Sequence, residues 1–252
     1  MQLNLDYSLC EGYKSNTQKM RVVTEKWVEQ NMFCPICGRP HLHHYTANKP
    51  VADFCCENCH NDFELKSKNQ VALGKVINDG AYDTMMERLN DLHNPNFLFM
   101  THTDEYVRNF ILIPNHFFTP EIIIKRKPLS DKARRAGWVG CNINIADIPK
   151  SGKIYIVKAG VDIDRNKVID DYARIRSLAT NNLTSRGWML DVLSCVERVK
   201  DDVFTLKEMY DFCDELQEKH RDNAHVKDKI RQQLQFLRNK GLVEFLGRGN
   251  YR

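Results

Sequence analysis

The chain has 252 residues, of which 42% are hydrophobic and 28% are charged, and its formal net charge is +4. This length fits one large domain or two ordinary ones, and the composition is typical of a soluble globular protein. No run approaches the roughly 18 apolar residues that a membrane-spanning helix needs. The N-terminal region carries Glu11, Lys14 and Glu25 and lacks the apolar segment of a signal peptide. We therefore expect a cytoplasmic protein.

The first two thirds of the chain predict a mixed α/β domain with a central sheet. Residues 11–31 predict one or two helices, and residues 50–66 alternate loosely and predict a hairpin. Residues 79–89 predict a helix, because Tyr82 and Met86 belong to a set of apolar residues at i, i+3, i+4 and i+7 spacing. Buried strands are predicted at residues 96–102, 109–117 and 153–160.

The last third predicts a winged helix. After Gly160 the strand signals stop, and residues 161–183 are polar and helical in pattern. Three helices then follow, the second opening with a capping box formed by Thr205 and Glu208. Gly241 ends the third helix, and a hairpin with the tip "GRGN" closes the chain. We therefore expect one domain at 1–182 and a winged helix-turn-helix domain at 183–252.

Charge is distributed unevenly within this C-terminal region. Residues 197–218 hold eight acidic residues against three basic ones, a net charge of −5. Residues 219–252 hold nine basic residues against three acidic ones, a net charge of +6. Positive charge concentrated at one end of a chain indicates binding to a polyanion.

Two pairs of cysteines have the spacing of a zinc ribbon. Eighteen residues separate the pair Cys34 and Cys37 from the pair Cys56 and Cys59. We choose Cys56 over Cys55, because pairing Cys55 with Cys59 breaks the two-residue spacing. Four thiolates leave no open coordination position, so the predicted Zn²⁺ is structural. The alternative is a set of unrelated reduced thiols, and His41, His43 and His44 in the intervening loop are assigned no ligand role.

The pattern P-x-x-D…E-x-K covers the same stretch. Asp53 follows Pro50, and ten residues separate Asp53 from Glu64-Leu65-Lys66. Nucleases with this pattern hold a hard divalent ion, usually Mg²⁺, with the two carboxylates. The backbone carbonyl of Leu65 is a further candidate ligand. Strand alternation places Glu64 and Lys66 on one face. Lys66 can then orient the attacking water, neutralise the phosphate, or accept a proton if its pKa is lowered.

The third helix of the winged helix has a face suited to reading DNA. Its apolar stripe comprises Val226, Ile230, Leu234 and Leu237. Amide side chains read adenine in the major groove and guanidinium groups read guanine, whereas wing residues contact phosphate. The alternative is an ordinary solvated polar face. The candidate contacts are Lys229, Arg231, Gln232 and Gln235 on the helix and Arg248 on the wing.

A second basic run holds six Lys or Arg residues between Lys125 and Arg135, followed by Trp138. Such runs are usually only solvated surface. A basic loop with an aromatic residue at its tip can also cradle DNA and present the ring to a base or methyl group. The candidate DNA contacts in this run are Lys125, Arg126, Arg134, Arg135 and Trp138.

Several longer stretches resemble the DpnI family of methyl-directed type II restriction endonucleases. The resemblance covers nearly the whole chain and is carried by "YKSN", "NKPVADF", "FELKSK", "INDGAY", "RRAGWVGCNI", "SRGW", "KIRQQLQ" and "GRGNYR". These stretches are more specific than either metal motif alone.

The resemblance implies an α/β fold in which a PD-(D/E)xK restriction-endonuclease-like mixed sheet with a zinc-ribbon insertion precedes a winged-helix domain. It implies a bacterial enzyme that cleaves double-stranded 5′-GATC-3′ sites carrying N6-methyladenine with Mg²⁺, both domains binding the methylated site. The catalytic positions carried over are Asp53, Glu64 and Lys66, and the zinc ligands are Cys34, Cys37, Cys56 and Cys59. Two recognition domains on one chain are compatible with a monomer.

Two alternatives remain at the level of sequence. One is a DNA-binding regulator with a zinc ribbon, a winged helix and no working catalytic centre, although the intact D…E-x-K spacing argues against it. The other is an RNA-processing nuclease, which is less favoured because a major-groove reading helix has little use on A-form RNA. The number of metal ions, the way both strands are cut, activity on half-methylated sites and the residues that read each base stay open.

Overall fold

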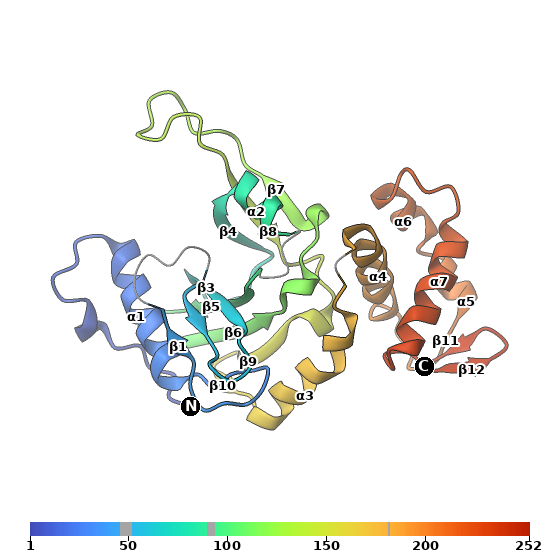
Figure 1. The fold of residues 1–252 in the computed structure, drawn as a ribbon, viewed down its shortest axis with the longest axis horizontal. Coiled ribbons are helices and arrows are strands. Elements are labelled where there is room, and N and C mark those ends of the chain that lie inside the picture. Colours follow the sequence, from blue (N-terminus) through green and yellow to red (C-terminus); the bar gives the residue numbers. More distant parts are fainter. Residues whose placement is uncertain (46–51, 90–93, 181) are drawn as a thin grey trace.

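We analysed a computed structural model of the chain, which describes residues 1–45, 52–89, 94–180 and 182–252. A mixed α/β body carries the N-terminus, and a smaller, mostly helical body carries the C-terminus (Figure 1). Among the described helices, none combines the length and the apolar character needed to cross a bilayer.

The α/β body is built around a seven-stranded mixed sheet with the order β1-β2-β3-β5-β6-β9-β10. Only the pair β3 and β5 is parallel, and the other pairs are antiparallel. Every residue of the central strand β5 is buried, which explains its continuous apolar run. The strands are β1 (His43–His44), β2 (Phe54–Cys55), β3 (Asp62–Asn69), β5 (Asn96–His102), β6 (Val107–Ile113), β9 (Ile154–Lys158) and β10 (Val161–Asp162).

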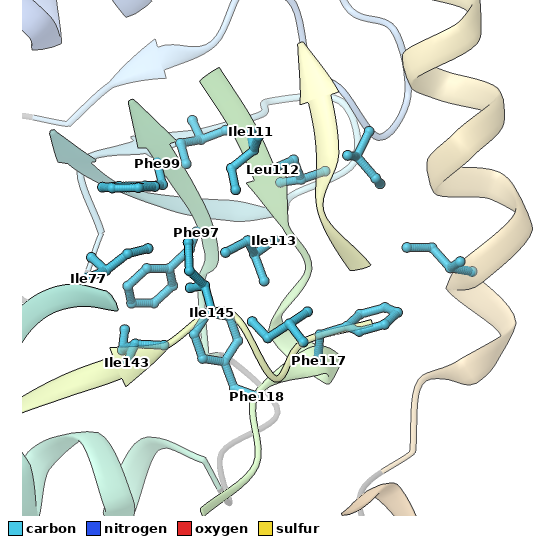
Figure 2. Packing of buried hydrophobic residues seen from close by; sticks show 14 of the residues in the cluster. Ile77, Phe97, Phe99, Ile111, Leu112, Ile113, Phe117, Phe118, Ile143 and Ile145 are labelled. Atoms are coloured by element: carbon cyan, nitrogen blue, oxygen red, sulfur yellow. The ribbon is translucent and has the colours of Figure 1, made fainter. Parts of the chain in front are cut away.

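A second sheet of three antiparallel strands, in the order β4-β8-β7, packs on this central sheet. Ile77 of the second sheet and the buried Ile143 lie next to Phe97, and Ile145 lies close by (Figure 2). On α1 (Asn16–Asn31), Trp27 packs edge-on against Phe110 of β6 with ring centroids 5.5 Å apart. The remaining elements here are η1 (Tyr7–Cys10), β4 (Val76–Ala81), α2 (Tyr82–Arg88), η2 (Asn115–Phe117), η3 (Pro120–Ile122), β7 (Ile123–Lys125), β8 (Gly140–Asn144) and η4 (Lys150–Gly152).

The C-terminal body has the helix-turn-helix and wing that the sequence predicts. The strands form a small sheet in the order β11-β13-β12. Val226, Ile230, Leu234 and Leu237 on α7 are all buried, as the apolar stripe requires. α3 (Arg165–Ile175) and η5 (Arg176–Leu178) end the α/β body, where α3 packs on β9. The elements of the C-terminal body are α4 (Leu183–Val196), β11 (Phe204–Thr205), α5 (Leu206–Tyr210), α6 (Cys213–Lys219), α7 (Val226–Asn239), β12 (Phe245–Gly247) and β13 (Asn250–Tyr251).

The two bodies touch through α4. The buried guanidinium of Arg186 donates hydrogen bonds to the carbonyl oxygens of Phe118 and Thr180. At the other end of α4, the carboxylate of Glu197 accepts the backbone N–H groups of Lys150 and Ser151 and so caps η4. These polar contacts attach the C-terminal body to the sheet domain at both ends of one helix.

Three local predictions were wrong. The second of the three predicted C-terminal helices, the one that opens at Thr205, is in fact two helices, α5 and α6. The N–H groups of Asp211 and Phe212 bond to carbonyls only three residues back and so interrupt the α-helical ladder. Residues 161 and 162 form β10, so strands continue past Gly160. Residues 79–81 belong to β4, and the helix predicted from residue 79 begins only at Tyr82. The capping box of Thr205 and Glu208 is present as predicted.

Candidate active site and metal centre

The four cysteines predicted as zinc ligands meet at one point. Their Sγ atoms all lie within 4.8 Å of one another, and this is the one potential metal-ligand group found among the described His, Cys, Asp and Glu residues. The Sγ atoms of Cys34 and Cys59 are 3.7 Å apart, and those of Cys37 and Cys56 are 3.5 Å apart. Four sulfurs at about 2.3 Å from a tetrahedral zinc would be about 3.8 Å apart. The cluster therefore has the size that zinc requires.

Each cysteine pair lies in a tight turn, and the two turns have the same backbone geometry. After the first pair, the N–H of Gly38 donates to the carbonyl of Cys34 at 2.9 Å, and Gly38 has φ of +76°. After the second pair, the N–H of His60 donates to the carbonyl of Cys56 at 2.8 Å, and His60 has φ of +55°. Each chain segment thus turns back through a left-handed residue directly after its second cysteine. Cys55 lies outside the cluster.

The cluster joins two parts of the chain that the candidate active site needs. One cysteine pair follows α1, and the other forms the turn between β2 and β3. The N–H of Asp53, just before β2, donates to the carbonyl of Phe63 on β3 at 3.0 Å. A metal bound at this turn would restrain the short hairpin that carries Asp53 on one side and Glu64 on the other.

Asp53 is held against the middle of β3. One carboxylate oxygen, Oδ2, accepts the backbone N–H of Leu65 at 2.7 Å. Burial raises the pKa of Asp53, and the Leu65 bond and the charge of Lys66 oppose that rise. The N–H and C=O of one strand residue face the same neighbour, so the carbonyl of Leu65 also points toward Asp53. Pro50, the first residue of the predicted motif, lies outside the described residues.

Glu64 and Lys66 share one face of β3, as the strand alternation predicts. The amine of Lys66 lies 2.6 Å from Oε1 of Glu64, and the other oxygen, Oε2, lies 2.8 Å from a guanidinium nitrogen of Arg88 on α2. Burial alone would lower the pKa of Lys66, but Glu64 and Asp79 outweigh burial and the pKa is raised. The amine therefore stays protonated, which favours its electrostatic roles over proton acceptance.

The sequence analysis missed Asp79 and Arg88. The Oδ1 atom of Asp79 is 2.6 Å from the amine of Lys66, and the Asp79 side chain is only 4% exposed. Asp79 comes from β4, in the other sheet, so the two sheets meet at Lys66. Its position within "INDGAY" gave no chemical signal, because the segment was interpreted as the start of a helix.

The carboxylate of Glu25 also lies near Asp53. Glu25 on α1 lies 2.7 Å from Nε of Arg21 and 3.4 Å from Nε2 of His44. Its charge raises the pKa of Asp53, whereas that of Arg21 lowers it. Asp53 thus sits between groups of both signs.

Two profiles of known protein families match the chain. The profile described as the Dam-replacing family, DpnI, matches residues 1–181, and the profile described as the Dam-replacing HTH domain matches residues 184–252. The chain belongs to the Dam-replacing family. It is accordingly a methylation-dependent restriction enzyme with a DNA-binding helix-turn-helix domain.

In this Dam-replacing enzyme, the DNA contacts predicted in the basic run 125–138 lie at the end of β7 and on the segment between β7 and β8, which projects far from the sheets (Figure 1). Trp138 is not at its tip. The N–H of Leu129 donates to the carbonyl of Trp138, so the tip lies between these two residues and Trp138 lies near the base. The guanidinium of Arg135 stacks on the Trp138 ring at 4.5 Å, and the amine of Lys125 lies over the Tyr82 ring at 4.8 Å.

The second group lies on α7 and the wing, apart from the first. Gln232 and Gln235 are exposed on α7, while Lys229 is half-buried. Arg231 pairs with Asp228 and donates to the hydroxyl of Tyr210 at 3.0 Å. Arg248, exposed at the wing, adopts φ of +49° between two glycines. Gln232, Gln235 and Arg248 are therefore accessible to a ligand on this face of the C-terminal body.

Proposed function

We propose that the protein is a type II restriction endonuclease that hydrolyses both strands of 5′-GATC-3′ sites carrying N6-methyladenine, with Mg²⁺ at Asp53, Glu64 and the carbonyl of Leu65. Residues 1–182 form the nuclease domain and residues 183–252 the winged-helix domain, and both contact the methylated duplex. The observation that supports this proposal most is that Asp53 accepts the N–H of Leu65 while Glu64 and Lys66, on either side of Leu65, pair with each other.

The donor set suits a hard cation. Oδ1 of Asp53 accepts no hydrogen bond from the described part of the chain, because only Oδ2 is held by Leu65. Two carboxylates and a carbonyl are the oxygen ligands that Mg²⁺ prefers. When bound, Mg²⁺ acidifies a water molecule and polarises the phosphate. The neighbouring Cys₄ cluster binds Zn²⁺ in a structural role. Thiolate ligands favour Zn²⁺ and oxygen ligands favour Mg²⁺, so each site selects its own ion.

Lys66 supplies positive charge at the scissile phosphate. Its amine stays protonated beside Glu64 and Asp79, so it stabilises the negative charge that develops on the phosphate oxygens and orients the attacking water. Arg88, which contacts the other oxygen of Glu64, fixes the rotamer of that carboxylate. Lys66 and Arg88 thereby hold the two carboxylate oxygens of Glu64 in place.

The winged helix and the loop between β7 and β8 would bind the same duplex. Zinc-binding thiolates must remain reduced, which fits the cytoplasm of a bacterium. Because one chain contributes both recognition surfaces, we propose that a monomer binds one site.

Digestion of matched plasmids tests the function. Plasmid DNA with adenine-methylated GATC sites should be cut with Mg²⁺, whereas the unmethylated plasmid, or the methylated plasmid with a chelator, should stay intact. Cleavage of both plasmids to the same extent would contradict the methyl requirement.

The substitution Asp53→Ala tests the catalytic assignment. It should leave binding to a methylated duplex unchanged and abolish cleavage, since one Mg²⁺ ligand is lost. Asp170→Ala, which removes an exposed carboxylate from α3, is the matched control and should cut normally. Retained cleavage by Asp53→Ala would reject this residue as a metal ligand.

A further inference from the structure

A cleft of about 970 Å³ lies where the two bodies meet, away from the candidate active site. Its walls come from β9, α3 and η5 of the first body and from residues 240–242 at the end of α7. Figure 1 shows α3 and the lower end of α7 on the two sides of this region. β9 is separated from β3, which carries Glu64 and Lys66, by β5 and β6.

The lining of the cleft is strongly basic. Seven Lys or Arg residues line it, and Asp171 is its one acidic residue. Lys167 pairs with Asp171 at 3.0 Å, and the amine of Lys153 is occupied by the carbonyls of Ile145 and Ile148. Positive charge therefore remains in excess after these internal contacts.

Three of the cations are free to meet a ligand. Arg174, Arg176 and Lys240 are exposed, and none has a carboxylate within 4.0 Å among the residues that the structure describes. Arg174 and Arg176 stand two residues apart where α3 passes into η5, and Lys240 faces them from the other body. Guanidinium groups bind phosphate through paired hydrogen bonds, so this arrangement suits a phosphate ester.

Two hydroxyl groups in the same lining lack partners. The Oγ atoms of Ser151 and Ser177 are buried and make no hydrogen bond within the described part of the chain. A buried hydroxyl without a partner is rare and calls for an explanation. Both Oγ atoms are shielded from solvent, so they lie behind the cleft wall, and the exposed cations carry the proposal.

We propose that this cleft binds the phosphodiester backbone of DNA that flanks the recognition site. The proposal rests on the proposed function, because it assumes a duplex at the nuclease centre. Three strand spacings of about 4.8 Å place β9 about 14 Å from β3 across the sheet. One turn of B-DNA is about 34 Å long, so a duplex that extends beyond its site has the length to reach the cleft. Contact with backbone alone adds affinity without sequence information.

The salt dependence of binding tests the proposal with the zinc-loaded full chain in Mg²⁺-free buffer. The double variant Arg174→Glu and Arg176→Glu is compared with the unaltered protein on methylated duplexes of about one and about three helical turns. On the long duplex, the slope of log K against log salt should become shallower by about 2, since each phosphate contact contributes about 0.9. On the short duplex, the slope and the cleavage rate with Mg²⁺ should not change.

A matched control reverses two exposed charges elsewhere. Lys200→Glu and Lys207→Glu lie in the acidic stretch 197–218 and should change neither slope. The milder pair Arg174→Gln and Arg176→Gln keeps the test valid if charge reversal disturbs folding, and it should also reduce the long-duplex slope. Equal slopes for variant and unaltered protein on the long duplex would overturn the proposal. Failure of short-duplex cleavage in the unaltered protein would instead count against the proposed function.

A free nucleotide is the other source of the same phosphate chemistry. Titration calorimetry with deoxyadenosine monophosphate should show no binding that depends on Arg174 and Arg176. If the nucleotide binds through these residues while long-duplex binding is unchanged, the occupant is a small molecule and the backbone proposal is wrong.

Discussion

Asp79 and Lys66 come from different sheets, and their side chains meet at 2.6 Å. Because the Asp79 carboxylate is almost wholly shielded from solvent, the ion pair is screened less than a surface pair would be. Glu64 also contacts the Lys66 amine, but in our proposal Glu64 serves the metal as well. Asp79 is then the contact that positions Lys66 independently of the metal ligands.

We expect Asp79→Asn to slow cleavage by about tenfold to a hundredfold, since a displacement of about 1 Å of a positioned group can cost that much. The effect should fall on the rate constant of single-turnover cleavage, with the affinity for methylated duplex unchanged. A change in affinity alone would contradict a positioning role.

Two further variants separate positioning from folding. Asp79→Glu keeps the charge and should restore part of the rate. Asp83→Asn removes an exposed carboxylate from the first turn of α2 and should cut normally. If Asp79→Asn and Asp83→Asn lose the same amount of activity, the ion pair with Lys66 is not the cause.

The four-cysteine cluster predicts a difference between a cysteine inside it and one outside it. Cys37→Ser should lose bound zinc, lower Tm by about 10 °C and abolish cleavage, because a loss of about 3–4 kcal/mol shifts Tm by roughly 2–4 °C per kcal/mol in a chain of this size. Metal analysis and thermal unfolding measure these effects. Cys55→Ser, which alters a thiol outside the cluster, should retain zinc. If Cys55→Ser loses zinc while Cys37→Ser retains it, the assignment of the zinc ligands is wrong.

What the sequence predicted well depended on fixed local spacing. The two cysteine pairs, the face shared by Glu64 and Lys66 and the apolar stripe of α7 each follow from one turn, one strand or one helix. These short-range patterns depend little on what packs around them, so the four-cysteine cluster and the shared face of Glu64 and Lys66 lie where the sequence predicts them.

The features that the sequence analysis missed, strand β4 and the role of Asp79, depend on tertiary contacts. β4 carries Asn78, Asp79 and Gly80, which are poor strand formers, and it is a strand because it pairs with β8. The apolar spacing around Tyr82 therefore suggested a helix that began too early. The pairing of Asp79 with Lys66 spans the two sheets, and no spacing along the chain encodes it.

Trp138 should contribute to methyl discrimination. Burial of one methyl group contributes about 0.8 kcal/mol, or about a fourfold preference. We expect Trp138→Ala to lower the ratio of kcat/KM on methylated over unmethylated duplex by about fourfold or more. Arg135→Ala removes the cation stacked on this ring and should weaken both substrates similarly, since phosphate contacts carry no methyl information. An equal loss on both substrates for Trp138→Ala would contradict a methyl-reading role.

His116 makes the stability of the fold sensitive to acid. The side chain is buried between the sheet domain and α3, with its Nε2 atom 3.2 Å from the carbonyl oxygen of Ile175. Burial lowers its pKa to about 4, the Ile175 carbonyl opposes the shift, and the nearby charge of Arg186 adds to it. The ring is therefore neutral in the folded protein at pH values where the unfolded chain, with a pKa of about 6.5, is already protonated.

Because the unfolded state binds the proton first, stability should fall as pH decreases from about 6.5 to about 4, by at most about 3 kcal/mol. Above pH 6.5 this group contributes no pH dependence. His116→Gln should flatten the stability profile in that window, as measured by urea unfolding at several pH values. Burial also lowers the pKa of His102. Its contribution to the pH dependence is the same in His116→Gln and in the unaltered chain, so it cancels when the two are compared. The control His41→Gln changes an exposed histidine and should leave the dependence of unfolding free energy on pH as it is in the unaltered chain. If His116→Gln also leaves this dependence unchanged, another group is responsible for the acid sensitivity.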